Sequence, residues 1–170
     1  MSNPKPENEE MPTYEKMLLR KLISNLNTML LQLDDDTVFD NEVENLIVDL
    51  RYQLDRREDI SDDSRSLINT MLNQALDFAR DIGKSVDNAE ELLADVKDEE
   101  LDFAQIKLKF EAIYTEILDA MQSIWPVVIT HQTLCSSFEL CNGKLYNKVL
   151  DIHTKLENVA YEIFRYLTNL

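Results

Sequence analysis

Apolar residues recur at spacings of three and four along almost the whole chain after residue 12. This is the period of an α-helix with one buried face. The pattern predicts helices over about 13–33, 41–57, 62–82, 87–96, 103–125, 127–141 and 144–169. Each seam lasts only a few heptads before a break, so we expect an all-α fold, an antiparallel bundle of about six to seven helices with coiled-coil-like seams.

Two of the breaks decide the number of helices. Gly83 either ends a helix or lies inside a longer one, because a glycine in a helix costs only about 1 kcal/mol relative to alanine. Pro126 is expected to lie in a turn that follows Trp125. A continuous helix over 103–141 would be about 58 Å long, well beyond the lengths expected for the first and last helices. Asn142 and Gly143 are expected to end the helix after Pro126.

Polar residues in front of the apolar periods mark where the helices begin. Asp102 with Gln105, and Asn41 with Glu44, have the spacing of reciprocal capping pairs. Thr13 is a candidate N-cap of the first helix.

Glycine and proline are too scarce for a fold built on many tight turns. The chain has two glycines and four prolines, and three of the prolines lie in the first 12 residues. A β-sandwich or barrel would need more turn residues. We expect a disordered tail over 1–12 and a single helical domain over 13–170. Two sub-bundles, an acidic one over 13–97 and a nearly neutral one over 102–170, are the alternative.

The formal charge is −16, and it is unevenly distributed. Residues 1–102 carry 26 acidic and 11 basic side chains, whereas residues 103–170 carry 7 and 6. Direct binding to nucleic acid or to an anionic membrane is disfavoured, since both attract positive charge. The acidic half suits a partner protein with a basic surface, or it is only a solvated face.

The N-terminal segment is polar and no apolar run approaches the roughly 18 residues that span a membrane. We expect a soluble, intracellular, cytoplasmic protein. Secretion by a route without a cleaved signal peptide remains an alternative.

Residues for catalysis or metal binding are few. His131 and His153 are not preceded by the Glu-x-x-His pattern of di-iron bundles, so no metal site is expected. His131 and Cys135 are one turn apart, but no local motif supports a Cys–His nucleophile. A Cys135–Cys141 disulfide is expected only if the segment is not helical, since six helical residues rise about 9 Å. We therefore expect no enzyme and no cofactor.

Two apolar stripes exceed what one bundle seam requires. They are Tyr114, Leu118, Met121 and Trp125 in one helix, and Tyr146, Leu150, Phe164 and Leu167 in the last one. Core packing is the ordinary interpretation of such stripes, and a partner-binding surface is the alternative.

These observations favour a non-catalytic protein–protein interaction module: an adaptor, regulator or inhibitor that acts through a helical face, with a homodimer as one form. The stripe on the last helix is its candidate contact surface. One alternative is an acidic decoy that imitates nucleic acid, for which the candidate residues are Asp55, Glu58, Asp59, Asp62 and Asp63. A second alternative is a ligand-binding or enzymatic bundle with a pocket near 125–141.

Overall fold

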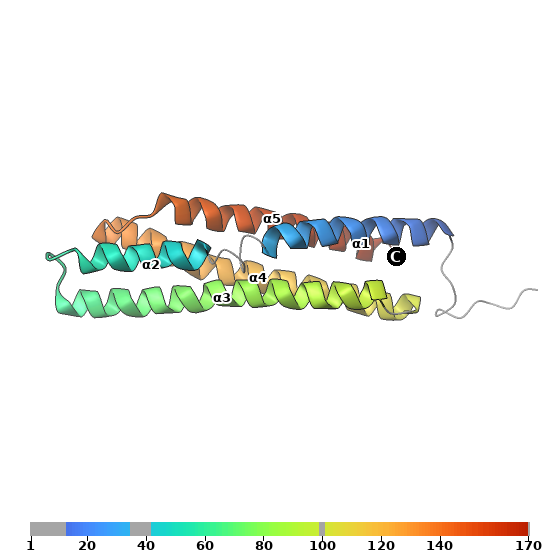
Figure 1. Ribbon diagram of the computed structural model, residues 1–170, viewed down its shortest axis with the longest axis horizontal. Helices are drawn as coiled ribbons and strands as arrows, with labels where there is room; N and C mark the ends of the chain where they lie inside the picture. The colour runs from blue at the N-terminus through green and yellow to red at the C-terminus, as the bar shows by residue number, and fades with distance from the viewer. Residues whose placement is uncertain (1–12, 35–41, 99–100, 170) are drawn as a thin grey trace, which may run out of the picture.

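The computed structural model describes residues 13–34, 42–98 and 101–169 (Figure 1). These residues form five helices and no strand: α1 (Thr13–Asp34), α2 (Glu42–Asp55), α3 (Asp62–Asp98), α4 (Phe103–Phe138) and α5 (Gly143–Thr168). The predicted all-helical class is confirmed, with five helices rather than six to seven. The predicted tail over 1–12 lies outside the described residues, and the domain division stays a prediction.

The helices form an elongated bundle with four columns (Figure 1). α1 and α2 follow one another along one column and run in the same direction, whereas α3, α4 and α5 each fill a column and alternate in direction. α3 packs on α4 and α4 on α5, while α1 and α2 each contact both α3 and α5. The architecture is therefore that of an up-and-down four-helix bundle whose first column consists of two helices.

The expected turn at Pro126 is wrong, because Pro126 lies inside α4. The expected turn presupposed a bundle as long as one ordinary helix, but α1 and α2 lie end to end and α3 is itself 37 residues long. A 36-residue α4 therefore matches the bundle. Ile124, Val127 and Val128 are buried on both sides of the proline. Packing of these side chains stabilises the helix against the loss of one backbone donor.

Gly83 lies inside α3, so the helices expected over 62–82 and 87–96 are one helix. The apolar period passes through Gly83 with little slip, and Ile82 and Val86 are both buried. Their packing outweighs the cost of glycine in a helix interior.

The capping prediction for Asp102 and Gln105 is confirmed. The Gln105 N–H donates to Asp102 Oδ1 over 2.8 Å, and the Asp102 N–H donates to Gln105 Oε1 over 3.0 Å. This reciprocal pair satisfies two backbone donors at the start of α4. Asn41 and the side chain of Thr13 lie outside the described residues.

The core is one cluster of buried side chains drawn from all five helices. Leucine, isoleucine and valine dominate it, and Phe110 is the largest fully buried side chain. Each such side chain contributes about 1.5–3 kcal/mol by leaving water.

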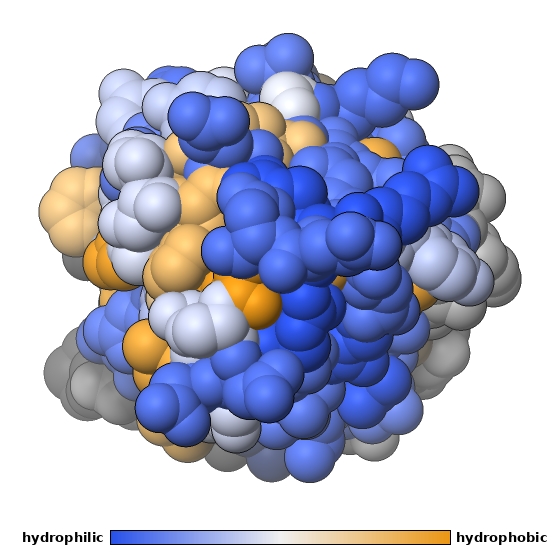
Figure 2. Space-filling view, turned by 90° about the vertical axis from the view of Figure 1, so that its left-hand side faces the viewer, coloured by the Kyte–Doolittle hydropathy of each residue, from blue (hydrophilic) through white to orange (hydrophobic). Residues whose placement is uncertain are grey.

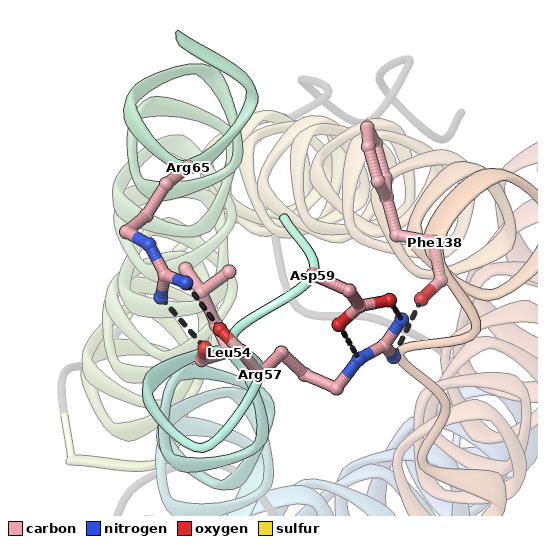
Figure 3. Close-up of polar contacts among 5 residues, drawn as sticks. All are labelled: Leu54, Arg57, Asp59, Arg65 and Phe138. Carbon is pink, nitrogen blue, oxygen red and sulfur yellow. Dashed lines mark hydrogen bonds and ion pairs between the residues drawn. The ribbon is translucent and has the colours of Figure 1, made fainter. Parts of the chain in front are cut away.

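Two arginines, Arg57 and Arg65, form hydrogen bonds that stabilise the end of the bundle where α2 is followed by α3 (Figure 3). Arg65 of α3 donates to the carbonyl of Leu54 over 2.7 Å and also to that of Arg57. Arg57 pairs through two nitrogens with Asp59 and donates to the Phe138 carbonyl at the end of α4 over 2.9 Å. The guanidinium groups thereby add hydrogen-bond donors to carbonyls at and just beyond the ends of α2 and α4, among them the Leu54 carbonyl, which also accepts the Arg57 N–H over 3.0 Å.

Candidate functional site on the outer face of α4 and α5

The two apolar stripes predicted from the sequence meet where α4 and α5 pack side by side. The ring of Tyr114 lies 6.4 Å from that of Phe164, and the ring of Trp125 lies 5.0 Å from that of His153. Helical spacings of three and four place further apolar residues beside these pairs. We call this row the α4–α5 seam; it comprises Tyr114, Leu118, Met121, Trp125 and Ile129 of α4, and Leu150, His153, Tyr161 and Phe164 of α5.

Large apolar side chains of the seam are open to solvent. The exposed fraction is 48% for Trp125, 50% for Phe164, 58% for Ile129 and 61% for Tyr161. Single exposed apolar residues are common on protein surfaces, and Leu108, at 64%, is one of them here. A row of such residues along two adjacent helices is the pattern of an interaction surface.

The α4 side of the seam lacks charged residues beyond Asp119, whereas the α5 side carries Glu157 and Arg165, whose guanidinium lies 5.8 Å from the centre of the Tyr161 ring. Residues 120–138 of α4 contain no aspartate, glutamate, lysine or arginine, although the whole chain carries a net charge of −16. On the α5 side, Glu157 pairs with His153, with 2.6 Å between the carboxylate and Nδ1. A partner that covers the part of the seam beyond Asp119 on α4 would therefore need few charges of its own there.

The four residues of the α5 stripe predicted from the sequence differ in their surroundings. Tyr146 and Leu167 are half-buried and pack against the core. Leu150 is half-buried, and Phe164 is exposed. Their role in partner binding stays a prediction, with Phe164 the most accessible of the four.

Sequence reasoning missed two members of the seam. Ile129 lies one turn after Trp125, and Tyr161 lies three residues before Phe164. Both extend the stripes at helical spacing. Ile129 was not assigned to the α4 stripe from the sequence, because Pro126 was expected to end the helix before this residue.

The acidic candidates lie together at one end of the molecule. Asp55, Glu58, Asp59, Asp62 and Asp63 are all exposed at the α2–α3 turn. Figure 2 views this end, and most of its surface is hydrophilic, with a smaller hydrophobic area to one side. Asp59 is held by Arg57, whose hydrogen bonds lower the pKa of this carboxyl to about 2. Asp59 is therefore ionised at neutral pH.

The sequence predicted, as one alternative, a ligand pocket near residues 125–141. In the structure, side chains of this segment pack and form hydrogen bonds within the bundle. His131 is buried, and its Nε2 accepts the Asn142 N–H over 2.8 Å. Burial lowers the pKa of His131, because the charged ring is poorly solvated there. An open depression next to this segment is lined by Leu46, Asp49, Cys141, Asn142, Gly143 and Lys144.

The doubted disulfide is present: Cys135 and Cys141 are bonded, with 4.6 Å between their Cα atoms. The expectation assumed a helix up to residue 141, but α4 ends at Phe138. Glu139 takes a left-handed conformation, with φ of 55°, and turns the chain back toward Cys135. In this oxidised form the Cys135 sulfur has no thiolate with which to act as a nucleophile.

No group of three or more histidine, cysteine, aspartate or glutamate side chains in the described residues could hold a metal ion. No described helix is long and apolar enough to cross a membrane.

Comparisons with protein-family models, with curated proteins and with solved structures find no match to this chain.

Proposed function

We propose that the protein is a non-catalytic protein-binding module that contacts its partner through the α4–α5 seam. The observation that carries this proposal is the row of half-exposed aromatic and aliphatic side chains along two packed helices. The row lies beside a stretch of α4 without charged residues, in an otherwise acidic chain.

The seam has the chemistry of a binding hot spot. Trp and Tyr are enriched among the residues that dominate binding energy, and full burial of one large apolar side chain contributes about 1.5–3 kcal/mol. Trp125 and Phe164 are each supported by a ring of the neighbouring helix. Because helices hold them in place, little ordering entropy opposes binding.

The partner that fits best is a protein with an apolar helical face. An amphipathic helix can lie along the seam and place residues at i, i+3, i+4 and i+7 against it. A second copy of the chain could supply such a face through its own seam.

Affinity purification from the native host tests this proposal with three versions of the chain: the wild type, Trp125→Ser combined with Phe164→Ser, and Leu108→Ser. Leu108 is more exposed than either seam residue and lies on another side of α4, so it controls for general loss of surface apolarity. The proposal expects proteins that the wild type and Leu108→Ser recover and that the double variant loses. Equal recovery by all three, with circular dichroism showing intact helices, would refute it.

The acidic decoy remains a second candidate, favoured by the five exposed carboxylates at the α2–α3 turn. It predicts a basic partner whose binding weakens steeply with salt. Neutralising Asp62 and Asp63 as Asp62→Asn with Asp63→Asn would then reduce recovery of the partner, whereas the seam substitutions would not.

A further inference from the structure

The disulfide lies in the short connection between α4 and α5. Cys135 is half-buried in the last turn of α4, and Cys141 is exposed immediately before Asn142, the N-cap of α5. The bond therefore links the end of one helix to the start of the next, within reach of reagents in solution.

Non-covalent contacts close the same connection. The Glu139 N–H donates to the Cys135 carbonyl and the Leu140 N–H to the Leu134 carbonyl, each over 3.1 Å. Leu140 is 1% exposed and belongs to the core. Asn142 accepts the Leu145 N–H with its side chain. These contacts, which form a left-handed helix C-cap and an N-cap, do not involve the sulfur atoms, so they keep the two helices folded when the disulfide opens.

The connection also contacts α2 across the bundle end. Gln53 donates to the Cys141 carbonyl over 2.9 Å, and Asn142 donates to Asp49 Oδ2 over 3.0 Å. Arg57 reaches the Phe138 carbonyl in the same way (Figure 3). A change at Cys141 therefore acts directly on contacts between α2 and the α4–α5 connection.

We propose that Cys135 and Cys141 form a reversible redox site that thiols open and disulfides close, and that its state sets the mobility of the α4–α5 connection. The reductant is a low-molecular-weight thiol or dithiol. Its thiolate attacks the sulfur of the exposed Cys141, the bond between the cysteines breaks, and its electron pair goes to Cys135, which takes up a proton. A second thiolate attacks the mixed disulfide, releases Cys141 as a thiolate that is then protonated, and leaves the reductant as a disulfide.

Reduction frees Cys141 while the helices persist. The buried Leu140 and the caps keep the bundle folded, but the constraint on the six-residue span is gone. The hydrogen bonds at Cys141 and Asn142 then open more often. This inference is independent of the partner proposed above, because it concerns the chain alone.

The test uses the full chain with dithiothreitol as reductant and glutathione disulfide as oxidant. Alkylation followed by mass spectrometry counts free thiols, circular dichroism follows helix content, and NMR hydrogen exchange follows single amides. We expect two free thiols after native reduction, unchanged helix content and reclosure by glutathione disulfide. The amides of Leu140, Asn142 and Leu145 should exchange about tenfold faster, whereas those of Ile113 and Ile117 in the middle of α4 should be unaffected.

Three results would overturn the inference: thiols that become reactive only in denaturant, loss of helix content on reduction, or unchanged exchange at the connection. The Cys135→Ser and Cys141→Ser double variant is the control for the reagent. It should show the fast exchange in the absence of dithiothreitol and no further change in its presence.

Discussion

Arginine side chains at the α2–α3 turn stabilise the helix ends by donating hydrogen bonds to backbone carbonyls there. Arg65 reaches two such carbonyls, those of Leu54 and Arg57, from the first turn of α3. Its replacement removes two charge-assisted hydrogen bonds to partly buried carbonyls, although the Leu54 carbonyl keeps the Arg57 N–H as a donor.

We predict that Arg65→Met lowers the free energy of unfolding by about 1–3 kcal/mol. Urea unfolding followed by circular dichroism measures this change. Arg56→Met is the matched control, since Arg56 is exposed in the same turn, and should shift the value by less than about 0.5 kcal/mol. Equal effects of the two substitutions would show that the bonds of Arg65 do not matter.

His131 should make stability depend on pH. Its Nε2 accepts a backbone N–H, so the neutral ring carries its proton on Nδ1, which is buried without a partner in the described residues. Burial lowers the pKa of His131 below its usual 6.5, so the unfolded chain binds a proton first as the pH falls. Stability is therefore fully present above about pH 6.5 and declines from there to the lower pKa of the folded state.

The difference between wild type and His131→Gln isolates this effect from the other titrating groups. We predict that the wild type loses more unfolding free energy than the variant between pH 7 and pH 5, at no more than about 1.4 kcal/mol per pH unit. Urea unfolding at each pH measures it. Parallel curves for the two proteins would contradict the predicted shift.

At the scale of elements, α4 stays helical through Pro126 because the residues on both sides of the proline are packed in the core. Pro126 has no N–H to bond the preceding turn, and proline in a helix interior is about 3 kcal/mol less favourable than alanine. We predict that Pro126→Ala raises the unfolding free energy by about 1–3 kcal/mol. The lower end of this range applies because alanine gives the unfolded chain more conformational freedom than proline does, which offsets part of the gain. Gln122→Ala, at an exposed site one turn earlier, should be nearly neutral. No gain for Pro126→Ala would favour a turn at this residue.

Gly143 offers a second test of a helix boundary. It is the first residue of α5, its φ is not positive, and a methyl group added there would meet no atom within 4 Å. Gly143→Ala should therefore stabilise the protein by about 0.4–1 kcal/mol, chiefly by restricting the unfolded chain. Thermal and urea unfolding check this, and destabilisation would show that the residue is not helical.

A local signal predicted the start of α4, where Asp102 and Gln105 form the expected capping pair. The pair lies within four residues, so the sequence contains all of its parts. Asn142 was expected to end the preceding helix, but it is the N-cap of α5. The positions at which a helix is interrupted were predicted less well. Whether Pro126 ends a helix depends on what packs around it, and that is decided by residues far away in the chain.

At the scale of the whole molecule, the end-to-end placement of α1 and α2 sets the length of the bundle. This placement leaves room for α3 and α4 to run its full length (Figure 1). The sequence predicted both apolar stripes of the seam but not their meeting, because the register of two antiparallel helices is a tertiary property. Rings 50 residues apart, as in Tyr114 and Phe164, become neighbours only when α4 and α5 pack.

The most direct test of the proposed function is the salt dependence of binding to the recovered partner, measured for the wild type and Trp125→Ser at about 0.15 M and about 0.5 M salt. Burial of the apolar side chains of the seam predicts a dissociation constant that changes little with salt. It also predicts a Trp125→Ser variant that binds about 30-fold more weakly, the loss of one hot-spot side chain. Binding that disappears in the higher salt and is indifferent to Trp125→Ser would contradict the seam as the contact surface.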